Sequence, residues 1–232
     1  MPIQAIVNTA HSLSYYLKLQ EVTANNLANS ETDAFKADRL AAHIVPGAEG
    51  AGAVPVETLD LQQGTLRDTS RPLDLALQGP GFFVVRTNLG ERLTRGGSYT
   101  LDGQGRLTDP HGDPLLGPEG AIVLSGGNAD VRGDGTIFVD GTYAGRLRIE
   151  NVADPANLLK EEKGRFIPTS ATSPVDSGGT IVHQGSVEDA NIDPILSMVD
   201  MITIQRAYSA NIDALRAMDS VLGIVTGEVG KV

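Results

Sequence analysis

The sequence predicts an α+β protein, with two discontinuous long terminal helices that pack as a coiled-coil pair and a central all-β domain of short strands. The first observation is that residues 2–29 and about 192–229 contain little Gly or Pro, whereas nearly all of the 27 Gly and 12 Pro residues lie between them. Gly and Pro at this density interrupt helices and form turns, which favours strands in the middle. The second observation is that both ends repeat apolar side chains at helical spacing.

The first helix is predicted from a stripe of side chains that are alternately three and four residues apart. This is the a/d spacing of a coiled coil, and Gln20 is its one polar member. The stripe consists of Ile3, Ile6, Ala10, Leu13, Leu17, Gln20, Ala24 and Leu27.

The second helix carries a stripe with the same spacing, with Pro194 near its start and Asn211 as the polar member. Its residues are Met201, Ile204, Tyr208, Asn211, Leu215, Met218, Leu222 and Val225. Helices of about 26 and 35 residues would be about 40 and 50 Å long. Because neither helix can bury its stripe alone, we expect the two to pack on each other. The alternative is two ordinary amphipathic helices on one globular core.

The middle of the chain is predicted to form short strands joined by tight turns. The expected strands are 73–77, 82–85, 91–95, 99–101, 106–108, 122–124, 136–139, 145–151 and 181–184. Asp-Gly pairs at 102–103, 134–135 and 140–141 are preferred residues for tight hairpin turns. We therefore expect a helical domain of residues 1–36 and 190–232, an extended linker at 37–72, and a β domain at 73–189.

The composition argues against several classes of function. The chain has no Cys, which excludes a thiol nucleophile and Cys-ligated metals, and the four His lack the spacing of a zinc-binding helix. The formal net charge of -11 argues against nucleic-acid binding, which needs clustered Lys and Arg. No apolar run is long enough to span a membrane. We find no catalytic constellation and no pattern for a metal or cofactor, so we expect neither membrane insertion nor an enzyme.

Four stretches, in order along the chain, resemble the bacterial flagellar axial proteins of the rod and hook. The first is the run ANNLANSETDAFKADR after the first helix, which includes Asn25, Asn26, Leu27, Ala28, Asn29, Phe35 and Lys36. The second runs from Gln63 to Phe83, the third from Leu93 to Asp102, and the last from Gln184 to Tyr208 with Gln205 and Arg206. The family usually has Gly where Ala34 stands, so that turn is expected to differ locally.

The resemblance implies a structural subunit of the flagellar rod, the drive shaft between motor and hook. Its implied partners are copies of itself, other rod and hook proteins, and the flagellar type III export apparatus. Its implied location is the periplasm-spanning rod of the basal body, reached without a cleaved signal peptide. The two helical stripes would supply the assembly contacts, and no cofactor or metal is implied.

The chain length and the C-terminal residues favour the proximal-rod members of this family over the distal-rod members. A non-catalytic β-type binding module with a helical stalk is the alternative from another class. That alternative would need a cleft lined by aromatic side chains, yet the chain has no Trp and few clustered aromatics.

Overall fold

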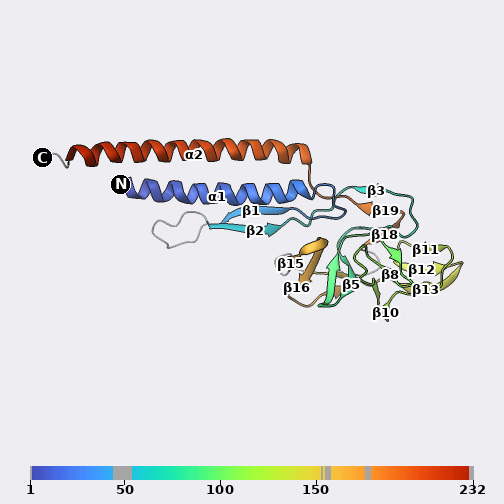
Figure 1. The fold of residues 1–232 in the computed structure, drawn as a ribbon. Helices are drawn as coiled ribbons and strands as arrows, with labels where there is room; N and C mark the ends of the chain where they lie inside the picture. The colour runs from blue at the N-terminus through green and yellow to red at the C-terminus, as the bar shows by residue number, and fades with distance from the viewer. Residues whose placement is uncertain (1, 44–53, 153, 155–157, 176–178, 230–232) are drawn as a thin grey trace. The chain divides into compact units, whose positions relative to one another are not determined.

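The computed structural model describes residues 2–43, 54–152, 154, 158–175 and 179–229. Its described residues form two long helices at the chain ends and a strand-rich region between them, which confirms the predicted α+β class (Figure 1). The chain divides into two compact units. The helical unit contains residues 1–28, 38–58 and 193–232, and the β unit contains residues 29–37 and 59–192.

The helical unit consists of two helices and one hairpin. Helix α1 spans Pro2–Ala28 and α2 spans Pro194–Val229. Asp193 caps α2 because its Oδ1 accepts hydrogen bonds from the backbone N–H groups of Ile195 at 2.9 Å and Leu196 at 3.1 Å. Pro194 follows as the first helical residue, where its missing N–H has no cost. Strands β1 (Asp38–His43) and β2 (Val54–Leu59) pair with each other.

The β unit contains the remaining strands, all of them short. They are β3 (Leu66–Asp68), β4 (Leu75–Gln78), β5 (Phe82–Thr87), β6 (Gly90–Thr94), β7 (Thr100–Leu101), β8 (Leu107–Thr108), β9 (Leu116–Gly117), β10 (Gly120–Ala121), β11 (Ala129–Val131), β12 (Thr136–Val139), β13 (Thr142–Arg146), β14 (Ile149–Asn151), β15 (Leu158–Glu161), β16 (Arg165–Pro168), β17 (Ser173–Pro174), β18 (Ile181–Gln184) and β19 (Ser186–Glu188). A short 3-10 helix, Glu162–Gly164, joins β15 to β16.

The largest sheet is antiparallel, with the strand order β15-β16-β6-β5-β14-β17. A second sheet has the order β11-β12-β13, and two-stranded pairs join β3 to β19, β4 to β18, β7 to β8 and β9 to β10. The earliest strands of this unit therefore pair with its last strands.

Strand β5 lies at the centre of the β unit and is buried on both faces. Phe83 and Val85 enter one hydrophobic core, while Phe82 and Val84 enter the other. Successive side chains of a strand point to opposite faces, so a continuous apolar run fits a strand that is covered on both sides.

The expected Asp-Gly turns are present. Asp140 and Gly141 have φ angles of 48° and 81° and join β12 to β13, the left-handed pair of a two-residue hairpin. Asp102 Oδ1 accepts hydrogen bonds from the backbone N–H groups of Gln104 at 2.8 Å and Arg106 at 2.9 Å, which closes the β7–β8 turn. These N–H groups hold the pKa of Asp102 below its usual value.

Two expected strands are wrong in detail. Residues 122–124 lie just after β10, and Val123 forms only an isolated bridge with Arg106. The expected strand at 145–151 is two strands, β13 and β14, because the chain leaves β12 after Arg146 and joins β5 at Ile149. The expected linker at 37–72 carries β1, β2 and β3.

Candidate functional site

The two helices lie side by side in opposite directions (Figure 1), and the predicted stripe of α2 is its covered side. Ile204 is buried, and the other described members of this stripe are half-buried: Met201, Tyr208, Asn211, Leu215, Met218 and Leu222. The side chain of Val225 lies outside the described residues. Gln205 and Arg206, which belong to the family motif, are exposed. The helix pairing is present, but its description as a heptad coiled coil stays a prediction.

The predicted stripe of α1 is only partly covered in the single chain. Leu13, Gln20 and Leu27 are half-buried, whereas Leu17 is 51% exposed. The side chains of Ile3 and Ile6 lie outside the described residues. Tyr16 and Thr23 are half-buried at the same helical spacing as Leu13, Gln20 and Leu27. The covered face of α1 is therefore rotated from the predicted one by part of a turn.

This rotation has a physical cause in the β1–β2 hairpin, which lies along α1 on the side away from α2 (Figure 1). Asn26 holds the start of β1 with both ends of its amide: Nδ2 donates to the Asp38 carbonyl at 2.8 Å, and Oδ1 accepts from the Asp38 N–H at 3.0 Å. Lys18 pairs with Glu57 of β2 at 2.7 Å. Helix α1 thus divides its burial between two neighbours.

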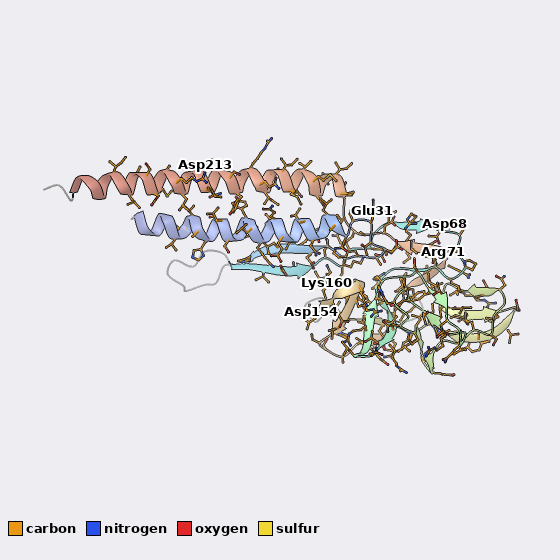
Figure 2. All side chains as sticks on the ribbon, in the orientation of Figure 1. Glu31, Asp68, Arg71, Asp154, Lys160 and Asp213 are labelled. Carbon is orange, nitrogen blue, oxygen red and sulfur yellow. The ribbon has the colours of Figure 1, made fainter. Side chains whose placement is uncertain are left out.

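Helix α2 carries a second apolar surface on the side away from α1, which we call the outer face of α2. Its members Ile195, Met198, Val199 and Ile202 are between 52% and 72% exposed. They follow the i, i+3, i+4, i+7 spacing of a helix-packing stripe. Figure 2 shows side chains along α2 that point away from α1. A helix with two opposed apolar faces can contact a partner on each side.

The first family motif ends α1 and turns the chain with a strained residue. Ala28 is the last helical residue, and the Asn29 carbonyl accepts a hydrogen bond from the Thr32 N–H at 3.0 Å. Ala34 has a φ angle of 58° and is buried. This left-handed conformation favours Gly, so Ala34 holds it at a steric cost from its Cβ. Asn25 is exposed.

Phe35 and Lys36, which follow this turn, are buried inside the β unit. Lys36 forms a salt bridge and hydrogen bond with Glu188 of β19, and both side chains are 0% exposed. Lys36 Nζ also donates to the Gln62 carbonyl at 2.7 Å. The ring of Phe35 lies beneath Lys160 Nζ, 3.8 Å from the ring centre, and Lys160 is labelled near β15 in Figure 2. Phe35 and Lys36 therefore belong to the interior of the β unit.

Glu188 connects all four family motifs, and we call Lys36, Gly64, Arg95 and Glu188 the motif cluster. Glu188 Oε1 accepts from the Gly64 N–H at 2.9 Å, and its Oε2 accepts from Arg95 at 3.4 Å. A Cβ on Gly64 would lie 2.0 Å from the Asp189 carbonyl oxygen, so only glycine fits this contact. Four motifs that are distant in the sequence therefore meet at one buried carboxylate.

The motif cluster buries two cations against one anion. Burial lowers the pKa of the Lys36 ammonium, and the Glu188 carboxylate opposes this shift. Burial also lowers the pKa of the Arg95 guanidinium. Arg95 donates to the Gly79 carbonyl at 2.6 Å, while its buried Nε has no hydrogen-bond partner within the described part of the chain. Glu188 therefore forms an ion pair with each of the two buried cations.

Other contacts close the same end of the β unit. Asn191 Oδ1 accepts from the Ala37 N–H at 2.8 Å, and its Nδ2 donates to the Asp60 carbonyl at 2.9 Å. Arg67 bridges Asp33 at 3.0 Å and Asp189 at 2.9 Å. Sequence reasoning placed these residues in motifs but assigned no role to Glu188, Arg95 or Asn191. The only signal for these residues was their place in the motifs, because Glu188 and Arg95 stand among other polar residues in the sequence.

Two further properties concern the part of the chain that the structure describes. It contains no group of three His, Asp or Glu side chains placed to hold a metal ion. None of its helices combines the length and apolar character that a membrane crossing requires.

Two family models match separate parts of the chain. Residues 76–142 match the flagellar hook protein FlgE/F/G D1 domain, which covers much of the β unit. Residues 183–227 match the C-terminal region of the flagellar basal body rod FlgEFG proteins, which includes β19 and most of α2.

Similar proteins extend the likeness over most of the chain. The flagellar basal-body rod protein FlgF of Escherichia coli is 34% identical in an alignment of 243 positions that covers 94% of this chain and 95% of that protein. FlgF of Caulobacter vibrioides is 30% identical over 203 residues, with coverage of 82% and 83%. FlgG of Buchnera aphidicola from Acyrthosiphon pisum is 30% identical in an alignment of 235 positions that covers 87% of this chain and 90% of that protein. The chain therefore belongs to the family of bacterial flagellar basal-body rod proteins, and its similarity favours the FlgF type.

Proposed function

We propose that this protein is a non-catalytic structural subunit of the flagellar rod that assembles through its terminal helices. Its partners are copies of itself and other rod and hook proteins, and the rod transmits torque from the motor to the hook. The subunit reaches the rod through the flagellar type III export apparatus without cleavage of a signal peptide. The similarity to FlgF proteins supports a position in the proximal rod.

The observation that carries this proposal is the outer face of α2. Helix α1 covers one side of α2, and Ile195, Met198, Val199 and Ile202 remain exposed on the other. Contiguous exposed apolar side chains mark interaction surfaces in soluble proteins. Contacts that join different surfaces of successive copies extend into a helical assembly, as a rod requires. The stripe residues Leu13, Leu17, Gln20, Leu27, Leu215 and Leu222 would then serve packing within and between subunits.

The test replaces two residues of the outer face, Val199→Asp with Ile202→Asp, in a strain that lacks its own copy of the gene. We expect the variant to be produced and exported but absent from purified basal bodies, with loss of motility. Leu89→Asp is the matched control, because Leu89 is 78% exposed on the β5–β6 turn and belongs to neither helix. Normal rods and motility in the double variant would refute assembly through this face.

The second candidate is a distal-rod subunit of the FlgG type, which the 30% identity to FlgG of Buchnera aphidicola favours. Complementation of strains that lack either FlgF or FlgG distinguishes the proximal from the distal position. Rescue of the FlgF-deficient strain alone would support the proximal position, and rescue of the FlgG-deficient strain alone would replace it with the distal one.

The proposal also competes with a β-type binding module on a helical stalk. Two cavities of about 400 and 460 Å³ lie in the β unit, and among the described residues no Phe, Tyr or Trp forms their walls. A smaller cavity of about 240 Å³ has a single aromatic side chain, Tyr143, in its wall. Such walls do not provide the aromatic platform that a module of this kind uses to bind sugars or peptides.

A further inference from the structure

The β unit is closed by its own last segment. Strand β19 pairs with β3, with Glu188 opposite Leu66, and β18 pairs with β4, with Gln184 opposite Leu75. The Gly185 N–H donates to the Asp74 carbonyl at 2.7 Å, and the Gly185 carbonyl accepts from the Thr69 N–H at 2.7 Å. The segment from 181 to 191 therefore completes pairings that begin more than a hundred residues earlier.

The same segment supplies the carboxylate that pairs with two buried cations. Lys36 lies in the junction after α1 and Arg95 follows β6, so both precede Glu188 in the chain. The side chain of Lys36 is 0% exposed and that of Arg95 is 6% exposed. Glu188 forms an ion pair with each of the two cations, while Asp60 adds a weaker electrostatic attraction to Lys36.

We infer that Glu188 acts as a closing latch, so that the hydrophobic cores of the β unit cannot pack until β19 brings this carboxylate between Lys36 and Arg95. Without Glu188 the two cations would be buried with too little opposite charge. Breaking a buried ion pair by loss of one partner is strongly destabilising, because the remaining charge is uncompensated. Partial closure by β5 and β6 alone is therefore unfavourable.

The latch predicts the order of events during folding of the complete chain. Pulse-labelled hydrogen exchange of the refolding wild-type protein follows the amides of β5 and β6 together with those of β18 and β19. We expect the two groups to become protected in one step, at rates within a factor of about two. Protection of β5 and β6 at least tenfold sooner than β18 and β19 would overturn the latch.

Charge variants test the cause of this coupling. Glu188→Gln leaves both cations without their paired carboxylate and should raise native-state exchange of the β5 and β6 amides about a hundredfold. Adding Lys36→Met removes one of these cations, so that only Arg95 is left without its paired carboxylate. The double variant should therefore recover at least tenfold of the lost protection.

The matched control is Asp189→Asn, which changes the adjacent carboxylate that pairs with Arg67 at the surface. It should leave exchange of β5 and β6 within twofold of wild type. If Lys36→Met fails to rescue Glu188→Gln, or if Asp189→Asn has an equal effect, the buried charges do not form a latch and the inference is wrong. Loss of protection only next to position 188 would also overturn it.

Discussion

At the scale of single residues, Ala34 shows how this chain tolerates local strain. Its φ angle of 58° places it in the left-handed region, and its backbone N–H donates to the Glu188 carbonyl at 2.6 Å. The left-handed conformation costs a residue with a Cβ about 1–2 kcal/mol. The turn remains because it sets Phe35 and Lys36 inside the β unit, where their contacts outweigh that cost.

Valine and glycine at position 34 should therefore affect stability to different extents. Ala34→Val adds a β-branched side chain to a buried left-handed position and should lower the free energy of unfolding by about 2 kcal/mol. In Ala34→Gly, relief of strain is offset by loss of a buried methyl and greater freedom of the unfolded chain, so the change should stay within about 1 kcal/mol. Urea denaturation measures both. Equal stability of the valine and glycine variants would contradict the strained turn.

Tyr99 should make the β unit less stable as the pH rises above 10.0. Burial raises the pKa of the Tyr99 hydroxyl well above its ordinary value of 10.0, and that hydroxyl donates to the Gly96 carbonyl at 2.8 Å. Above pH 10.0 the unfolded chain loses this proton while the folded chain keeps it. The folded state then binds more protons, so its stability falls as pH rises, by at most about 1.4 kcal/mol per pH unit.

Tyr99→Phe removes both the proton and the hydrogen bond. The variant should be less stable than wild type by about 1 kcal/mol at pH 8, because one buried hydrogen bond is lost. The difference should shrink and then reverse as pH rises above 10.0, since Phe has nothing to ionise. Unfolding free energies at pH 8 and pH 11, followed by near-ultraviolet circular dichroism, test this. A difference that is constant with pH would show that Tyr99 ionises equally in both states.

At the scale of elements, the sequence predicts what depends on local pattern. Low Gly and Pro content with spaced apolar residues predicts both helices, and the apolar run Phe82–Val85 predicts a strand, β5. The covered face of α1 could not be predicted, because it depends on a hairpin whose residues look like a linker. The residue pattern around Leu17 does not indicate that the side-chain amide of Asn26 forms hydrogen bonds with the backbone of Asp38. The contacts of the motif cluster could not be predicted either, since Lys36 and Glu188 are 152 residues apart in the sequence.

The stripe of α2 gives a prediction for the helix pair. Leu215 is half-buried in the α2 stripe that lies toward α1, so Leu215→Asp would place a charge in that apolar contact. We expect it to lower the stability of the helix pair by about 2–4 kcal/mol and to block rod assembly. Ala214→Asp, one residue away and exposed, is the control. Hydrogen exchange of α1 and α2 measures the change.

The β unit should be unaffected by Leu215→Asp, because its cores are made of other residues. Protection of the β5 amides therefore reports whether the damage is confined to the helical unit. Wild-type motility with unchanged helix protection in this variant would show that the α2 stripe makes no essential contact.

At the scale of the whole molecule, the two units differ in how completely their apolar side chains are buried within one chain. The β unit has two hydrophobic cores and a buried motif cluster, so its packing is complete within one chain. The described part of the helical unit has only Val22 and Ile204 as buried apolar residues, while Leu17 and the outer face of α2 remain exposed. A unit with so little buried apolar surface is marginal alone and gains stability from neighbours.

This division predicts different exchange behaviour in the free protein and in rods. In the monomer, the amides of α1 and α2 should exchange quickly, because helices with few buried contacts open locally at low free energy. In assembled rods the same amides should become strongly protected, whereas those of β4, β5 and β6 should be well protected in both states. Hydrogen exchange with mass spectrometry on the monomer and on purified basal bodies measures both units at once. If α1 and α2 were as protected in the monomer as in the rod, the helical unit would be self-contained and the rod would have to assemble through other surfaces.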